Sequence, residues 1–151
     1  MKAFTPADAG FRQRMHDSFA RQGVMHTLGA TLEVADAGRV VIVMPHKAEL
    51  TQQHGFVHAG IVSTALDSAC GYAAFSLMAA DAAVLTIEFK VNLLAPARGP
   101  WFRFEGLVVK AGRTISVVEG KAWQHEAGGM ESLCATMTAT VMTVQGRGLT
   151  H

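Results

Sequence analysis

Asp67 is the residue whose type and position most clearly suggest chemistry, because it lies in the middle of a long apolar segment. Residues 55–80 read GFVHAGIVSTALDSACGYAAFSLMAA, and no lysine or arginine among them could pair with the aspartate. Aspartate disfavours helix interiors, and burying its charge costs several kcal/mol unless it is paired or protonated. Asp67 is therefore either a structural residue facing a partner helix or a solvent-filled crevice, or a general base or nucleophile. We favour the catalytic interpretation.

His58, Ala59 and Gly60, at the start of the same segment, could stabilise an oxyanion. The first turn of a helix exposes unpaired backbone N–H groups, and the helix dipole adds partial positive charge there. The small Ala59 and Gly60 would let a substrate carbonyl approach these N–H groups closely. The alternative is an ordinary helix start at which His58 caps or packs.

Other catalytic signatures are weak or missing. His54 and His58 have the spacing of a zinc pair, but Gly55 argues against a helix there and no third ligand is near in the sequence. The sequence has no G-x-S-x-G elbow, no G-x-G-x-x-G and no P-loop. Cys70 and Cys134 lie in apolar runs and are expected to be reduced, buried and unreactive. We therefore expect neither a metal ion nor a cofactor.

Lys110, Gly112 and Arg113 surround an expected turn and could hold phosphate groups by charge and backbone N–H groups. Arg98, in a loop rich in proline and glycine, is a weaker candidate. Because charged turn residues are commonly just solvated, the alternative is an ordinary hairpin tip.

The elements that must position these residues begin with an N-terminal helix. A Thr-Pro pair at residues 5–6 predicts its start. Phe11, Met15 and Phe19 recur at helical spacing, and Gly23 is expected to end the helix.

Two strands and the apolar helix are expected next. Residues 30–36 and 39–46 read as strands joined by a turn in which Gly38 can adopt positive φ. Residues 47–57 are expected to be irregular. The apolar helix should run from residue 59 or 60 to about residue 80.

The second half of the chain has the period of β-strands. Polar and apolar residues alternate from Thr86 to Leu93 without exception. Three further strands are expected at 101–110, 114–124 and 131–144. Short turns between strands predict an antiparallel sheet of about six strands, and the apolar helix needs cover on most sides. We therefore predict an α+β fold in which this sheet wraps around the long central helix.

The bulk composition limits the classes of function. The chain has 151 residues, of which 50% are hydrophobic and 17% charged, and a formal net charge of +1. These values predict a single domain over residues 1–151 and argue against a nucleic-acid partner. Asp67 near the centre of segment 55–80 argues against a membrane span. The charged N-terminus lacks the apolar region of a signal peptide, so we expect a cytoplasmic protein.

The combined motifs resemble a known family, the PaaI-like hotdog thioesterases of phenylacetate metabolism. The sequence Gln52-x-x-Gly55-x-x-His58-Ala59-Gly60, with Asp67 nine residues after His58, is similar to the family's Asn-x-x-Gly-x-x-His-Gly-Gly and its following Asp. The stretch 86–97 and the Gly-Arg-Thr turn at 112–114 are also similar to it. The resemblance covers roughly residues 25–145.

The resemblance implies a hotdog fold that forms a homodimer or a homotetramer, with each active site at a subunit interface. It implies hydrolysis of an acyl-CoA or aryl-CoA, with Ala59 N–H as oxyanion donor and Asp67 of the partner subunit as general base or nucleophile. Gln52 would orient the thioester or the water, and Thr86 would assist the water. The resemblance also implies that the CoA moiety is contacted by Lys110, Gly112 and Arg113.

The sequence departs from the family pattern at two positions. Gln52 stands where the family usually has asparagine, and Ala59 stands where it usually has the first glycine. These departures leave a second hypothesis open, a hotdog protein that binds an acyl-CoA or acyl-carrier ligand without cleaving it. An enoyl-CoA hydratase ranks lowest, because no histidine follows Asp67 closely.

Overall fold

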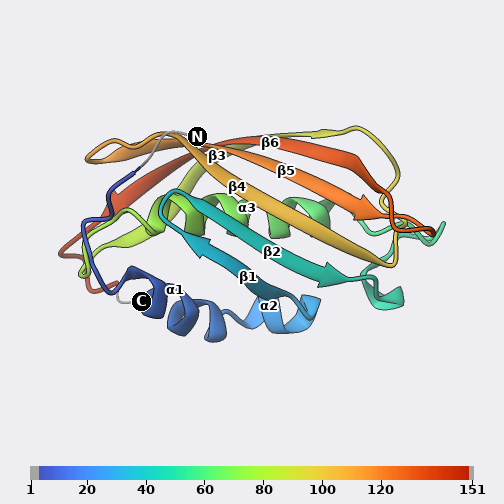
Figure 1. Ribbon diagram of the computed structural model, residues 1–151, viewed down its shortest axis with the longest axis horizontal. Coiled ribbons are helices and arrows are strands. Elements are labelled where there is room, and N and C mark those ends of the chain that lie inside the picture. Colours follow the sequence, from blue (N-terminus) through green and yellow to red (C-terminus); the bar gives the residue numbers. More distant parts are fainter. Residues whose placement is uncertain (1–3, 150–151) are drawn as a thin grey trace.

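The computed structural model describes residues 4–149 and places a long helix against a six-stranded antiparallel sheet (Figure 1). The strands at 101–110 and 131–144 have the predicted bounds, and the others lie within three residues of them. In chain order the elements are α1 (Phe11–Ala20), α2 (Gly23–Leu28), β1 (Thr31–Asp36), β2 (Arg39–Pro45), the 3-10 helix η1 (Ala48–Leu50), α3 (Ala59–Phe75), β3 (Ala83–Leu93), β4 (Trp101–Lys110), β5 (Ile115–His125) and β6 (Glu131–Val144).

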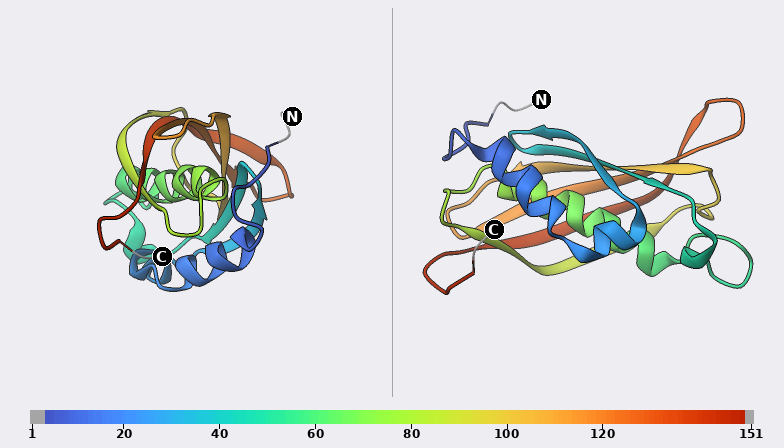
Figure 2. Two further views of the ribbon diagram at one scale, coloured as in Figure 1. Left: turned by 90° about the vertical axis from the view of Figure 1, so that its left-hand side faces the viewer. Right: turned by 90° about the horizontal axis from the view of Figure 1, so that it is seen from below.

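The sheet curves around α3, as the sequence predicts. Its strand order is β1-β2-β4-β5-β6-β3, so the segment between β2 and β3 leads from the strand next to the β1 edge to the opposite edge of the sheet. Seen end-on, the strands enclose α3 from one side, and α1 and α2 lie across the side that the sheet leaves open (Figure 2). The α+β hotdog architecture is therefore confirmed.

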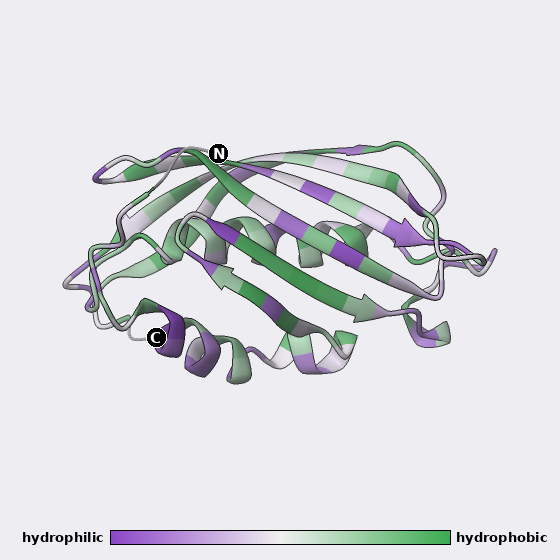
Figure 3. Ribbon diagram, viewed as in Figure 1, coloured by the Kyte–Doolittle hydropathy of each residue, from purple (hydrophilic) through white to green (hydrophobic). Residues whose placement is uncertain are grey.

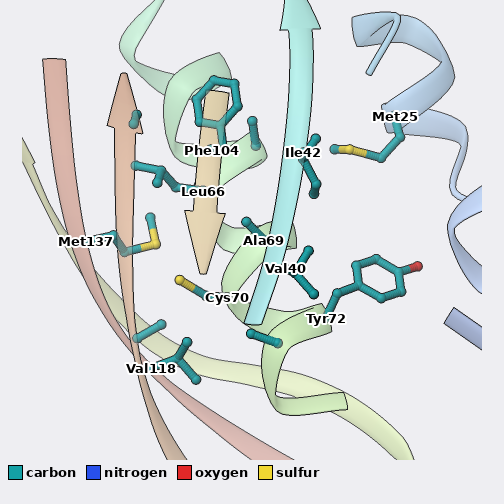
Figure 4. Close-up of a cluster of buried hydrophobic side chains, with 14 of the residues drawn as sticks. Met25, Val40, Ile42, Leu66, Ala69, Cys70, Tyr72, Phe104, Val118 and Met137 are labelled. Carbon is teal, nitrogen blue, oxygen red and sulfur yellow. The ribbon is translucent and has the colours of Figure 1, made fainter. Parts of the chain in front are cut away.

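The core lies between α3 and the concave face of the sheet. Leu66, Ala69 and Cys70 of α3 are fully buried against side chains from several strands (Figure 4). α3 and β2 are largely hydrophobic, whereas α1 carries many hydrophilic residues (Figure 3). The buried sheet residues of the core include Val40, Ile42, Met44, Phe102, Phe104, Val118, Met137 and Val141.

The N-terminal region differs from the prediction of one helix over residues 5–23. The carboxylate of Asp8 accepts the N–H of Gly10 at 2.9 Å, and α1 starts only after this turn. Gln22 has an extended backbone, with φ −79° and ψ 100°, which breaks the helix. Gly23 consequently begins α2 and does not end the first helix.

α3 also ends earlier than predicted, at Phe75 and not near residue 80. The hydroxyl of Ser76 donates to a carbonyl of the last helical turn at 2.6 Å and accepts the N–H of Gly38 at 2.8 Å. Arg14 of α1 donates to two carbonyls beyond the helix end at 2.8 and 2.9 Å. The contacts of Ser76 and Arg14 thus provide partners for carbonyl groups at and just beyond the end of the helix.

β3 forms an edge of the sheet and leaves apolar side chains exposed. The alternation predicted from Thr86 to Leu93 is interrupted by a shift of register between Thr86 and Glu88. An exposed edge strand carries unpaired backbone groups that can pair with another chain. The exposed apolar side chains, with their exposed fractions, are Leu85 (48%), Ile87 (54%), Phe89 (45%) and Leu93 (53%).

Two glycines in the middle of the sheet allow α3 to pack directly onto it. Gly106 of β4 is paired with Gly120 of β5. A Cβ at Gly106 would lie 2.3 Å from the carbonyl oxygen of Ala69, and one at Gly120 would lie 2.9 Å from Sγ of Cys70. Since the Ala69 oxygen belongs to the backbone, only a displacement of the α3 or β4 backbone could make room.

Gly106→Ala is therefore expected to lower the free energy of unfolding by about 1–3 kcal/mol, the usual cost of overpacking. Urea denaturation measures this change. Gly71→Ala is the matched control, because a Cβ at Gly71 in α3 meets no atom within 4 Å. That control should be neutral or up to about 1 kcal/mol more stable, since alanine favours helix interiors. Equal stability of Gly106→Ala and the wild type would contradict the close contact between α3 and β4.

Candidate active site

The start of α3 presents one unpaired backbone donor. Nδ1 of His58 accepts the N–H of Gly60 at 2.9 Å, so His58 is the N-cap of the helix. The N–H of Ala59 has no hydrogen-bond partner within residues 4–149. Of the predicted oxyanion residues, Ala59 thus keeps a donor for a ligand, whereas the donor of Gly60 is already used.

Ala59 opens onto an apolar cavity of about 380 Å³ that Gln52 also lines. The preceding loop is held by a bridge between Thr51 and Val57 and by the N–H of Gln52, which donates to Phe56 O at 2.8 Å. The Gln52 side-chain oxygen accepts the N–H of His54. The remaining lining residues carry no charge: Phe56, Val57, Val62, Leu93, Leu94, Ala95, Pro96, Ala97 and Cys134.

Asp67 lies in the middle of α3 and lines a second cavity, of about 260 Å³. Its Oδ1 accepts a hydrogen bond of 2.8 Å from the hydroxyl of Thr86 on β3. The carboxylate is partly exposed and is not the buried, unpaired group that its apolar neighbours in sequence suggested. The other lining residues are Gln22, Ser68, Gly71, Tyr72, Val84 and Leu85.

The two halves of the predicted site are separate within one chain. Asp67 follows Ala59 by eight positions along the helix, which corresponds to about 12 Å along the axis. The structure brings Gln52 together with Ala59, and Asp67 together with Thr86, but in different cavities. A reacting carbonyl needs its donor and its base each at about 3 Å. One chain therefore cannot present both groups to one thioester.

The predicted phosphate-binding residues lie at the other end of α3. Gly112 and Arg113 line a depression together with Leu77 and Met78, which follow the helix. The N–H of Gly112 donates to the hydroxyl of Ser116 at 3.3 Å. Lys110 ends β4 and is exposed. These residues are thus far from Ala59 of their own chain (Figure 1).

Both cysteines are buried free thiols, as predicted. Burial raises the pKa of Cys70 to about 12, and the nearby charge of Asp67 adds to this effect. Burial likewise raises the pKa of Cys134 to about 11. Both thiols therefore stay protonated near neutral pH and are poor nucleophiles.

Between residues 4 and 149, no group of three or more His, Cys, Asp or Glu side chains is arranged to hold a metal ion. His54 lies in a turn and His58 caps α3, so the two do not share a helical face. Within the same range, no helix has the length and apolar character needed to cross a membrane.

Two residues were not predicted from the sequence: Gln22, which lines the Asp67 cavity, and Gly106, which lets α3 pack closely onto β4. Gln22 belongs to no motif, and only the fold brings it to the Asp67 cavity. Gly106 gave a weak signal, because a glycine inside a strand pattern often marks a close approach of backbone.

Comparisons with known proteins are consistent with this geometry. Residues 54–130, which contain Ala59 and Asp67, match the family model of the thioesterase superfamily. A solved thioesterase family protein from Silicibacter pomeroyi is 58% identical, with a TM-score of 0.89 over 91% of this chain and 100% of that one. The E. coli PaaI protein from the phenylacetic acid degradation operon shares the fold, with 18% identity and a TM-score of 0.82 over 93% of this chain and 97% of its own.

A curated relative from Saccharolobus solfataricus is described as a candidate esterase. It is 41% identical over 85 residues, which is 56% of this chain. The chain spans 59% of the length of that relative.

Proposed function

Because the chain belongs to the thioesterase superfamily, we propose that it hydrolyses an acyl-CoA or aryl-CoA thioester to the free acid and CoA. The observation that carries this proposal is the unpaired N–H of Ala59, a residue that lines an uncharged, apolar cavity. A donor in that position suits the carbonyl oxygen of a thioester whose acyl group enters the cavity.

The active site is completed by a second copy of the chain. Thr86, next to Asp67, lies toward one end of β3, and Leu93, which lines the Ala59 cavity, ends the strand. Antiparallel pairing about a two-fold axis at residue 89 would set Leu85, which also lines the Asp67 cavity, opposite the partner's Leu93. This pairing would bring the Asp67 cavity of each subunit to the Ala59 cavity of its partner. It would also cover the exposed apolar side chains of β3.

The proposed reaction needs no group beyond these side chains and water. The N–H of Ala59 donates to the thioester carbonyl oxygen and stabilises the negative charge that develops there. The partner's Asp67 takes a proton from water while the water oxygen attacks the carbonyl carbon. The C–S bond then breaks, and the CoA thiolate recovers the proton from the carboxyl group. Direct attack by Asp67 is the alternative route to the same products.

Three further residues have supporting roles in this proposal. The hydroxyl of Thr86 holds Oδ1 of Asp67, which orients the carboxylate. Gln52 lines the same cavity as Ala59, and its amide would orient the thioester. In the proposed dimer the partner subunit runs in the opposite direction, so its β4–β5 turn, with Lys110, Gly112 and Arg113, would lie toward the Ala59 end of the first subunit. The positive charge of this turn would suit the phosphates of CoA.

The apolar cavity predicts a preference for uncharged acyl groups. A cavity of 150 Å³ accommodates benzene, so one of about 380 Å³ has room for an aryl group or a medium-length alkyl chain. Ala95→Phe would fill part of it. The ratio of kcat/KM for octanoyl-CoA to that for acetyl-CoA is then expected to fall roughly tenfold or more. Ala127→Phe, in the exposed β5–β6 turn, is the matched control and should leave the ratio unchanged. An unchanged ratio in Ala95→Phe would contradict this assignment of the cavity.

A panel of acetyl-, octanoyl-, palmitoyl-, benzoyl- and phenylacetyl-CoA, assayed by release of the free thiol, tests the proposed activity. Hydrolysis of at least one ester at enzymatic rates supports the proposal. Binding of these esters without thiol release would instead favour a non-catalytic acyl-CoA or acyl-carrier binding protein. Gln52 and Ala59, which replace the usual asparagine and glycine of the family pattern, leave this second candidate open.

A further inference from the structure

Gln22 is held in place by the ends of two helices. Its N–H donates to Phe19 O at 3.1 Å, and its carbonyl accepts the N–H of Met25 at 3.0 Å. The residue is the N-cap of α2, yet its side chain makes no capping hydrogen bond. The side chain is therefore available for contacts elsewhere.

The side chain of Gln22 reaches α3 next to Asp67. Its Oε1 accepts a hydrogen bond of 3.3 Å from the hydroxyl of Ser68, and both residues line the Asp67 cavity. This contact uses the amide oxygen, and the NH₂ group has no hydrogen-bond partner among residues 4–149. Gln22 also lies outside residues 54–130, the segment that matches the family model.

The hydroxyl groups around the Asp67 cavity already take part in hydrogen bonds. The hydroxyl of Thr86 donates to Asp67 at 2.8 Å, and that of Ser68 donates to Gln22. The hydroxyl of Tyr72 is bonded to Ser18 at 2.9 Å. Among the described side chains that line this cavity, the amide group of Gln22 is the one whose N–H donors have no partner.

We propose that Gln22 is a further catalytic residue, whose amide N–H holds the oxygen of the water that Asp67 deprotonates. The carboxylate of Asp67 would accept a hydrogen bond from one hydrogen of this water, and the water could still rotate about that bond. A second contact, from a donor to the oxygen, fixes which lone pair faces the thioester carbon. The inference rests on the proposed function, because it takes Asp67 as the base for water attack.

Three variants test this role with the fastest CoA ester of the panel. Gln22→Leu removes the donor and is expected to lower kcat about tenfold while KM changes less than twofold. Gln22→Glu keeps an acceptor for Ser68 but replaces the donor by a second carboxylate in the cavity. That variant should lower kcat and also move the acid limb of the pH profile of kcat upward, because a like charge disfavours ionisation of Asp67. Gln13→Glu, on the exposed side of α1, makes the same charge change as a matched control and should alter neither quantity.

Two results would overturn the role of Gln22. One is an unchanged kcat in Gln22→Leu. The other is a loss of kcat in Gln22→Leu that is accompanied by a lowered Tm, together with an unchanged acid limb of the pH profile of kcat in Gln22→Glu. That combination would assign Gln22 a purely structural role. Asp67→Asn, measured beside these variants, separates the two proposals. If no ester of the panel is hydrolysed, the proposed function fails. If Asp67→Asn stays active, Asp67 is not the base and the role of Gln22 fails with it. An inactive Asp67→Asn with a fully active Gln22→Leu refutes only the role of Gln22.

Discussion

Replacement of Asp67 by asparagine is expected to lower kcat for the best CoA ester by about 10²–10⁴-fold, the usual contribution of a general base. The amide can neither accept the proton of water nor attack the thioester as an anion. Its oxygen can still accept the hydrogen bond of Thr86, so the side chain should keep its place. Thiol release measures the activity, and urea denaturation should show a free energy of unfolding within about 0.5 kcal/mol of the wild type.

The matched control for this prediction is Asp17→Asn. Asp17 lies on the exposed side of α1, where it accepts a hydrogen bond from Gln13 at 2.9 Å. The same chemical change at this distant position should leave kcat unaffected. Wild-type rates for Asp67→Asn against every ester of the panel would remove Asp67 from the mechanism.

Ala59→Pro is expected to lower kcat by about 10²–10³-fold, because it deletes one oxyanion donor. Ala59 is the first residue of α3, and proline is well tolerated at this position of a helix. The preceding residue, His58, has φ −58° and ψ 138°, which is compatible with a following proline. The substitution therefore removes the N–H while the helix and the cap by His58 remain.

Mixing the two inactive variants tests whether Ala59 and Asp67 act across subunits. In a mixed dimer of Asp67→Asn with Ala59→Pro, one site carries both defects and the other carries neither. Random assembly from equal amounts should restore about a quarter of the wild-type activity. Unfolding and refolding the mixture allows the subunits to exchange, and each variant refolded alone is the control.

The mixture also has a clear contrary outcome. If both residues serve one site from a single chain, every site in the mixture carries one defect and no activity returns. The separation of about 12 Å along α3 argues against that arrangement. A permanently monomeric form of the protein should accordingly be inactive even with every catalytic residue present.

The sequence predicted most helices and strands, because the alternation of polar and apolar side chains within one element can be seen in a short stretch of sequence. The strands 101–110 and 131–144 agree in both bounds, since alternation of side chains across a sheet is visible in any strand of that length. The ends of α3 and of the N-terminal helices were predicted less well. Arg14, Ser76 and Gln22 decide where these helices stop, through contacts with residues distant in the sequence.

The sequence by itself determined which residue types could do chemistry and on which element each lies. Asp67 in the apolar helix and Ala59 at its start were both identified from composition and spacing. Only the tertiary structure decided which of these residues are neighbours: Ala59 and Asp67 line different cavities. Thr86 donates a hydrogen bond to Asp67, and Gln22, between α1 and α2, lines the Asp67 cavity. The physical reason is that periodicity records whether a side chain is buried, whereas its neighbours depend on long-range packing. The crossover that carries β3 to the edge of the sheet, next to β6, leaves no trace in local pattern, yet it makes a site shared between two chains possible.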